Sequence, residues 1–351
     1  MTIKYKAKEI YMDKVFFIGR FPPPYGGATI KSEILYSSLS KKVSMNKFDT
    51  EMQKENKVKF LINLIKFIFE NRNRKGIICV SSVSLFKFTK IINMLMPHML
   101  GNICVFAIGG VLDKLIVEND IDIKMLKKYK VIFVECEGLK SSLETLGLNN
   151  IEVIPNCRLR PINREYLRSY TDINNIRCLF MSRIDKEKGV FKILDAFDEL
   201  EENLCSIDFY GPIEESIKSI FSKRIKKSNL KYMGIVDSSK ENIYEIINKY
   251  DLLLFPTDHV GEGYPGILAE AKIAGIPIVT SDFRYSREII NNLEDGLIIH
   301  NNTSEEIANV IKKLYKDRGL LEKLRWNSFM SGERCIIDTY IDKIIHCVME
   351  G

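Results

Sequence analysis

The chain has 351 residues, of which 46% are hydrophobic, and it carries a formal net charge of +6. This length exceeds the usual size of one hydrophobic core by roughly a factor of two, which favours two domains. No apolar run approaches the roughly 20 residues of a membrane-spanning helix, and the N-terminus lacks a cleavable leader pattern. We therefore expect the protein to be made and kept in the cytoplasm.

Apolar runs typical of buried strands alternate with helical patterns along the chain, which predicts an α/β fold with parallel sheets. The polar, proline-marked stretch Pro155–Asn175 is the expected domain joint. We therefore assign residues 1–160 to a first domain and residues 161–330 to a second. The strands expected in the first half are Val15–Gly19, Ile77–Ser81, Ile103–Ile108, Val131–Glu135 and Glu152–Ile154. Those expected in the second half are Arg177–Met181, Ser206–Tyr210, Asp251–Phe255, Ile276–Thr280 and Leu297–Ile299.

The first strand is followed by the loop Arg20–Ala28, RFPPPYGGA, which opens an expected helix. Gly26 and Gly27 allow backbone N–H groups to come close to a phosphate or an acceptor. The loop lacks the Gly-x-Gly-x-x-Gly spacing of a dinucleotide site, which weakens a dehydrogenase interpretation. A plain tight turn after three prolines is the alternative.

Positive charge is concentrated in the first domain. Residues 1–160 carry 26 Lys and Arg against 15 Asp and Glu, a net of +11, whereas the remainder carries 26 against 31, a net of −5. Lys57–Arg74 and Phe86–Leu100 mix basic with bulky apolar side chains, so such a face could rest on anionic lipid headgroups. An ordinary helix that covers a sheet is the alternative for each segment. Nucleic acid is the rival partner, but no nucleic-acid-binding motif is recognisable, and we expect an anionic membrane surface.

Two carboxylates lie around the start of one expected helix in the second half. The strand Asp251–Phe255 is followed by a glycine-rich loop that holds Glu262 and by a helix that holds Glu270. Pro265 suits the first helical turn and Gly275 suits the helix end. A helix N-terminus can bind a phosphate while a nearby carboxylate holds a polyhydroxylated group. This arrangement predicts a site for a sugar nucleotide.

Two cations occupy a second loop, which follows the expected strand Arg177–Met181. Arg183 and Lys188 are either ordinary surface charges or the groups that hold an anion. The residues alone leave these two interpretations open.

These residues resemble the donor half of the retaining glycosyltransferases with the GT-B fold, as in glycosyltransferase family 4. The family motif of Glu, seven residues and Glu is matched by EGYPGILAE from Glu262 to Glu270. The family's loop Arg and Lys fall on Arg183 and Lys188. The resemblance implies two Rossmann-like domains with mainly parallel sheets that face each other across a cleft. It is strongest over Arg177–Leu314.

The resemblance also implies a role for each matched residue. Arg183 and Lys188 would hold the donor diphosphate, Glu262 would contact the sugar hydroxyls and position the anomeric carbon, and Glu270 would accept hydrogen bonds from the ribose. We take Glu262, Arg183 and Lys188 as the catalytic set. The expected donor-binding residues are Gly26, Gly27, Gly234, Ile235, Val236, Gly263, Tyr264, Pro265 and Glu270. No metal is expected, and no cofactor other than the nucleoside-diphosphate sugar as co-substrate.

The C-terminal segment and the first domain complete what the resemblance implies. Residues 331–351 would include a helix over Ser331–Met349 that crosses back onto the first domain. Many relatives place a His in a first-domain loop near the reacting sugar, but here Ile103–Ile108 is followed by Gly109, Gly110 and Val111. We therefore assign no general base. In the retaining reaction that the resemblance implies, the acceptor hydroxyl attacks on the face that the diphosphate leaves, and a diphosphate oxygen takes the proton.

The resemblance thus predicts a retaining, metal-independent glycosyltransferase of the hexosyltransferase type. It would move a sugar from a nucleoside-diphosphate sugar to a lipid-linked or polysaccharide acceptor in cell-surface polysaccharide biosynthesis, on the inner face of the cell membrane. A nucleotide-sugar epimerase of the same architecture and an inactive sugar-nucleotide-binding subunit of a polysaccharide assembly complex are the alternatives. The eight cysteines have no Cys-x-x-Cys spacing and are expected to be buried free thiols.

Overall fold

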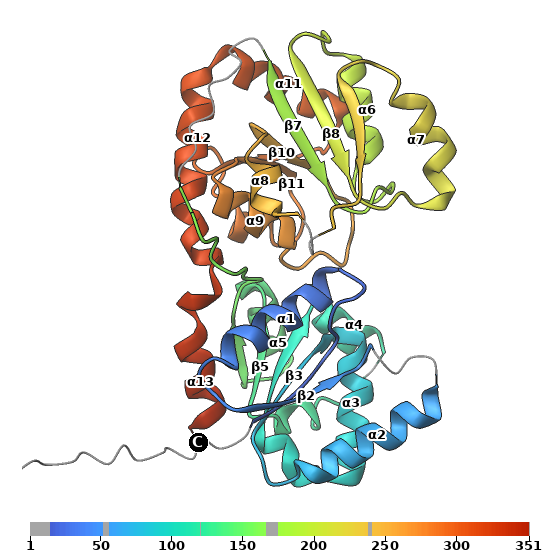
Figure 1. Ribbon diagram of the computed structural model, residues 1–351, viewed down its shortest axis with the longest axis vertical. Coiled ribbons are helices and arrows are strands. Elements are labelled where there is room, and N and C mark those ends of the chain that lie inside the picture. The colour runs from blue at the N-terminus through green and yellow to red at the C-terminus, as the bar shows by residue number, and fades with distance from the viewer. Residues whose placement is uncertain (1–14, 52–55, 120, 166–174, 238–240, 351) are drawn as a thin grey trace, which may run out of the picture.

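The computed structural model describes residues 15–51, 56–119, 121–165, 175–237 and 241–350, which form two α/β domains stacked end to end (Figure 1). Each domain is built around a six-stranded sheet, and the named strands pair in parallel throughout both sheets. The first sheet has the order β2-β1-β3-β4-β5-β6, with β1 Val15–Gly19, β2 Met45–Asp49, β3 Gly76–Ser81, β4 Ile103–Ile108, β5 Val131–Val134 and β6 Ile151–Val153. The second has the order β12-β11-β10-β7-β8-β9, with β7 Ile176–Met181, β8 Cys205–Tyr210, β9 Leu230–Gly234, β10 Leu252–Phe255, β11 Ile278–Ser281 and β12 Gly296–Ile299.

Helices cover both faces of the first sheet, which is why its central strands are apolar on both sides. One face is covered by four helices and the other by α1 together with the C-terminal helix α13. The helices of the first domain are α1 Gly27–Leu39, α2 Lys57–Glu70, α3 Ser82–Leu95, α4 Leu112–Glu118 and α5 Glu137–Thr145. Short 3-10 turns over Pro97–Asn102 and Leu126–Lys128 complete the connections.

The second sheet is covered in the same way. The helices α6, α7, α11 and α12 pack on one face, and α8, α9 and α10 pack on the other. Their bounds are α6 Val190–Asp198, α7 Lys218–Arg224, α8 Ile243–Ile247, α9 Gly266–Ala274, α10 Ser286–Ile289, α11 Ser304–Lys316 and α12 Arg318–Ser331. A 3-10 turn over Glu215–Ile217 precedes α7. In both sheets the carboxyl ends of the strands carry the loops that meet at the domain interface, and ligands bind at such ends in α/β proteins.

The predicted α/β architecture with two parallel sheets is confirmed, and the ten strands expected from apolar runs lie within two residues of their predicted bounds. Neither β2 nor β9 is among those ten strands. Both lie at sheet edges. Phe48 is the one buried residue of β2 and Leu230 the one buried residue of β9, so neither strand has the continuous apolar run of a central strand.

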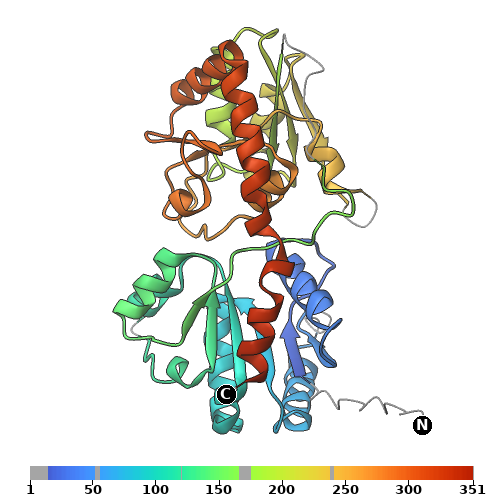
Figure 2. The same cartoon turned by 90° about the vertical axis from the view of Figure 1, so that its left-hand side faces the viewer.

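The C-terminal segment crosses back onto the first domain, as Figure 2 shows. The expectation of one helix over Ser331–Met349 is wrong in part, because 3-10 turns over Gly332–Cys335 and Ile337–Thr339 separate α12 from α13, Ile341–Met349. Ile341, Ile344 and Val348 of α13 enter the core beneath α1. The interruption lies where the segment passes between the domains.

The cysteines are as expected from the sequence. All eight cysteines are free and seven of them are buried, which confirms that they are not a disulfide framework. Across the part of the chain that the structure describes, no helix combines the length and apolar character needed to cross a bilayer.

Candidate active site

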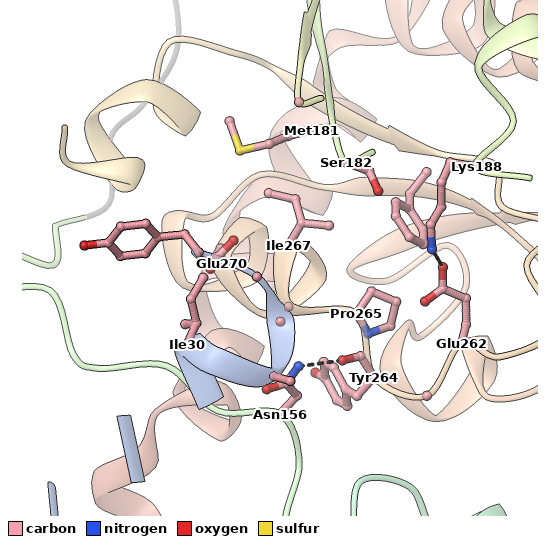
Figure 3. A pocket seen from close by; sticks show the side chains of 18 of the residues that line it. Ile30, Asn156, Met181, Ser182, Lys188, Glu262, Tyr264, Pro265, Ile267 and Glu270 are labelled. Atoms are coloured by element: carbon pink, nitrogen blue, oxygen red, sulfur yellow. Dashed lines mark hydrogen bonds and ion pairs between the residues drawn. The ribbon is translucent and has the colours of Figure 1, made fainter. Parts of the chain in front are cut away.

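A cavity of about 460 Å³ opens between the two domains and gathers most of the predicted site residues. The first domain contributes the loop before α1, the end of β4 and the residues after β5 and β6. The second domain contributes the loops after β7, β8 and β10 and the start of α9. Figure 3 shows side chains from both domains pointing into this space. Of the predicted residues, it is lined by Gly26, Gly27, Lys188, Val236, Glu262, Gly263, Tyr264, Pro265 and Glu270.

Glu262 and Lys188 form an ion pair on one wall of the cavity (Figure 3). The Lys188 ammonium donates to Glu262 Oε1, and the Thr257 hydroxyl donates to the same oxygen at 3.2 Å. Both charged side chains are about nine-tenths buried, at 12% and 11% exposure. The loop after β7 and the loop after β10 therefore bring together the two residues that the sequence placed 74 positions apart.

The helix α9 begins at Gly266, directly after Pro265, and ends at Ala274, where Gly275 caps it in a left-handed conformation with φ 76°. Pro265 therefore precedes the first helical turn instead of lying within it. The residues at the helix start line the cavity, so the positive end of the helix faces it. An anion in the cavity would meet these N–H groups and the Lys188 ammonium together.

Glu270 lies one turn into α9 and pairs with a residue of the first domain. Arg158 Nε donates to Glu270 Oε1 at 2.6 Å, and both side chains are buried. Burial disfavours the charged form of this guanidinium, yet the Glu270 carboxylate raises the pKa of Arg158 above its ordinary value. Sequence reasoning missed Arg158, which lies in the expected domain joint and belongs to no motif.

A second buried ion pair was also missed. Lys31 of α1 donates to Glu135 Oε1 at 2.5 Å, with side chains 5% and 3% exposed. Glu135 Oε2 accepts from the backbone N–H groups of Gly109, at 3.4 Å, and Tyr264, at 3.5 Å. Glu135 ends a predicted strand, and a charged residue at the carboxyl end of a buried strand was the available signal. The pair joins three loops that surround the cavity.

Arg183 does not line the cavity. It follows β7, its side chain is 54% exposed, and its Nε donates to the Asp185 carboxylate. Asp185 Oδ1 also accepts from the Lys188 backbone N–H at 2.8 Å, so the same carboxylate holds the loop that presents Lys188. The Asp185 pairing raises the pKa of the Arg183 guanidinium, against a smaller effect of burial.

Of the remaining predicted positions, one lines the cavity and others do not. Val236 lines the cavity, whereas Gly234 and Ile235 of the same segment are not among its lining residues. His259 lies in the Glu262 loop, but its Nδ1 pairs with Glu187 Oε2 at 2.6 Å, and it lines a neighbouring cavity of about 410 Å³ that shares Glu262. Among the described residues, no group of three or more His, Cys, Asp and Glu could hold a metal ion.

Comparison with known proteins finds similarity to glycosyltransferases. Residues 168–329 match the family model of "Glycosyl transferases group 1". The 2-deoxystreptamine N-acetyl-D-glucosaminyltransferase of Niallia circulans is 22% identical over 210 residues, which are 58% of this chain and 51% of that protein. The amylovoran biosynthesis glycosyltransferase AmsK of Erwinia amylovora is 22% identical over 211 residues, 57% of this chain and 49% of that protein. The chain thus spans about half the length of these curated relatives.

Solved structures resemble the whole chain. Anabaena HepE in complex with UDP-glucose superposes with a TM-score of 0.70 at 14% identity and covers 95% of this chain and 98% of its own. WaaG, a glycosyltransferase involved in lipopolysaccharide biosynthesis, superposes with a TM-score of 0.68 at 14% identity, covering 96% of this chain and 100% of its own. At this identity the likeness establishes the fold. The protein therefore has the GT-B fold, and residues 168–329 are similar to the group 1 glycosyl transferases.

Proposed function

We propose that the protein is a retaining hexosyltransferase that moves a sugar from a nucleoside-diphosphate sugar to a lipid-linked or polysaccharide acceptor. The observation that carries this proposal is the Lys188–Glu262 pair beside the N-terminus of α9, inside the interdomain cavity. It combines a cation and helix N–H groups for a diphosphate with a carboxylate for sugar hydroxyls. The family match over residues 168–329 supports the reaction class.

The donor would lie along the wall formed by the second domain. Its diphosphate would meet Lys188 and the amides near Gly263 and Tyr264, facing the Gly26–Gly27 loop across the cavity. Glu262 would contact the sugar, and Glu270 would accept from the ribose. The segment Gly234–Val236 would frame the base. Arg183 would leave Asp185 and turn toward the diphosphate, which has more negative charge to offer than one carboxylate.

The chemical step needs little more than charge and position. The acceptor oxygen bonds to the anomeric carbon on the face from which the diphosphate leaves, the bond from that carbon to the diphosphate oxygen breaks, and the acceptor proton passes to a diphosphate oxygen. Lys188 and the start of α9 stabilise the charge that the leaving group gains. The step as proposed uses no metal ion, no general base from the protein and no cofactor besides the sugar nucleotide.

The names of similar proteins support the substrate class. HepE structures hold UDP or UDP-glucose, and similar curated proteins act in amylovoran and capsular polysaccharide biosynthesis. We therefore extend the proposal to cell-surface polysaccharide biosynthesis. A panel of UDP-, GDP- and ADP-sugars, screened by thermal shift, identifies the donor because a ligand that binds only the folded state raises the apparent stability.

The test is turnover of that donor by the wild type and by Glu262→Ala and Arg183→Ala, with products identified by NMR. We expect transfer or slow donor hydrolysis with retained anomeric configuration, and at least a 100-fold loss in Glu262→Ala, the scale for losing a transition-state contact. Near-wild-type rates in both variants would remove the site assignment. An epimerised nucleotide sugar from donor alone would indicate an epimerase, and binding without turnover on any acceptor would indicate an inactive subunit.

We also propose that the first domain rests on the inner, anionic face of the cell membrane through α2. This helix lies on the outer side of the first domain, away from the second (Figure 1). Leu64 and Ile68 are its buried residues, whereas four large apolar side chains are more than 40% exposed among lysines. The exposed ones are Val58, Leu61, Ile62 and Phe69. Apolar groups among basic residues suit the headgroup region of an anionic bilayer.

A further inference from the structure

The chain passes between the domains at two crossings, one after β6 that holds Arg158 and one between α12 and α13 that holds Cys335–Ile337. The two crossings meet at Arg158. Its backbone N–H donates to the Cys335 carbonyl at 2.7 Å, and the Ile337 N–H donates to the Arg158 carbonyl at 2.9 Å, so that Arg158 pairs in parallel with Ile336. These bonds use only the backbone of Arg158. Joining the two crossings therefore does not require an arginine side chain at this position.

The side chain of Arg158 reaches from the crossing into the second domain. Besides the 2.6 Å bond from Nε to Glu270, a terminal nitrogen of the guanidinium donates to Asn156 Oδ1 and to the Cys157 carbonyl, both at 3.0 Å. Arg158 is 5% exposed and Glu270 is 7% exposed, and both line the cavity. The guanidinium is thus held at several points and presents Nε to one carboxylate oxygen.

The first residue of α9 leaves room for this guanidinium. A Cβ added to Gly266 would lie 1.5 Å from the other terminal nitrogen of Arg158. Side chains larger than hydrogen at Gly266 would therefore displace the arginine from the first turn of the helix. Within the described residues, the Arg158 bond is also the one side-chain hydrogen bond that Glu270 accepts, so its Oε2 remains available to a ligand.

We propose that Arg158 is a positioning residue that holds Glu270 in the orientation in which it recognises the ribose of the donor. This inference rests on the proposed function, in which Glu270 accepts from the ribose hydroxyls. It assigns the ribose site to both domains, because the carboxylate comes from α9 and the group that orients it comes from the crossing after β6. Donor binding would then depend on the contact between the crossing and the second domain.

The experiment compares a nucleotide with its 2′-deoxy form, so that the ribose contribution is measured separately from overall affinity. Calorimetry gives Kd for UDP and 2′-deoxy-UDP with the wild type and Arg158→Met. A hydrogen bond to a charged group predicts about tenfold weaker binding of the deoxy form to the wild type. In Arg158→Met we expect this ratio to fall below about threefold. A merely structural role would weaken both ligands equally, and an unchanged ratio would overturn the proposal.

Two further variants test whether a changed ratio comes from the position of the Arg158 guanidinium. Arg160→Met removes an arginine from the same crossing, where it pairs with Glu333 at the surface, and should keep the wild-type ratio. Gly266→Ala retains both charges and displaces the guanidinium, so it should lower the ratio as Arg158→Met does. Where Arg158→Met fails to fold, Gly266→Ala decides, and a tenfold ratio there contradicts the inference.

The choice of base does not change the design. GDP and ADP with their 2′-deoxy forms replace the uridine pair if one of them binds the wild type more tightly. A wild type that binds none of the three diphosphates contradicts the proposed function itself, and the inference fails with it. A wild type that discriminates tenfold while Arg158→Met does the same contradicts the role of Arg158 alone.

Discussion

Two lysine–glutamate pairs each contribute a carboxylate, Glu262 or Glu135, to the lining of the same cavity, and they differ in their surroundings. Lys188–Glu262 belongs to the second domain and has side chains 12% and 11% exposed, whereas Lys31–Glu135 belongs to the first domain and is 5% and 3% exposed. Among the described residues, the Glu262 carboxylate accepts one further hydrogen bond, from the Thr257 hydroxyl, whereas Glu135 also accepts from backbone groups of both domains. We therefore expect the first pair to exchange its partner for a ligand and the second to hold loops in place.

The largest effect on stability is expected from breaking the buried pair. Lys31→Met leaves Glu135 charged, buried and without its cation, and we expect the free energy of unfolding to fall by about 3–5 kcal/mol. Urea denaturation followed by circular dichroism measures it. The control is Lys42→Met, which breaks a pair with Asp342 whose side chains are 51% and 88% exposed and should cost at most about 1 kcal/mol. If the two variants lost equal free energy of unfolding, burial would not make the Lys31–Glu135 pair more important for stability than the exposed Lys42–Asp342 pair.

Breaking the pair in the second domain should affect turnover more than stability. Lys188→Met removes the proposed cation for the leaving diphosphate, so we expect kcat to fall about 100-fold. Glu262 also loses its cation, and we expect the free energy of unfolding to fall by about 1–3 kcal/mol, less than in Lys31→Met, because this pair is the more exposed of the two. Steady-state donor turnover and urea denaturation measure the two quantities. Lys192→Met is the matched control, since Lys192 pairs with Asp258 outside the interdomain cavity. A large loss of stability with unchanged kcat in Lys188→Met would make this pair structural.

These pairs also show what the sequence could and could not predict. Glu262 and Glu270 lie in one loop and helix, so local spacing and turn residues indicated both the elements and the motif. Lys31 and Glu135 are 104 residues apart, and Arg158 and Glu270 are 112 apart. Their contact depends on strand order and on the path between domains, which hydrophobic periodicity does not report. The loop and helix that carry Glu262 and Glu270 were therefore predictable, and the Lys31–Glu135 and Arg158–Glu270 contacts were not.

Three further features of the chain could not be predicted from local sequence patterns. The strand β2 was missed because an edge strand with one buried residue has no apolar run to detect. Arg183 was expected to lie beside Lys188 in the cavity, but its side chain extends to Asp185, and no spacing rule distinguishes the two orientations. The interruption between α12 and α13 follows from the crossing, whose backbone bonds to Arg158 a single straight helix could not make.

A substitution on the outer surface of the first domain should have a smaller effect than breaking either lysine–glutamate pair. Ile62→Glu places a negative charge in the exposed apolar row of α2, and we expect about tenfold weaker binding to phosphatidylglycerol vesicles, on the scale of burying one aliphatic side chain. Cosedimentation at low and high salt measures it. The control is Ile220→Glu on α7 of the second domain, where Ile220 is 54% exposed. Vesicle binding that is indifferent to lipid charge and to salt would contradict the membrane proposal.

The smallest effect is expected at the contact between the domains beyond the cavity. Arg284 of the second domain donates to Asp113 Oδ1 of the first at 3.0 Å, and the Ser142 hydroxyl donates to Asp113 Oδ2 at 2.5 Å. Burial opposes ionisation of Asp113, but these bonds together hold the pKa of its carboxyl below the ordinary 3.8. A lowered folded-state pKa contributes stability that is complete above the unfolded value and disappears as the pH falls through the folded value.

We therefore expect Asp113→Asn to lower the free energy of unfolding by about 1 kcal/mol at pH 6, because Arg284 is partly exposed and its pairing is screened. The gap in the free energy of unfolding between the wild type and Asp113→Asn should stay constant down to about pH 4. It should narrow below that pH, as the wild-type carboxyl is protonated. Urea denaturation between pH 7 and pH 3 measures the gap, with the exposed Asp122→Asn as control. A gap that widens in acid would show that Asp113 is protonated more readily in the folded state, so that burial outweighs the interdomain bonds.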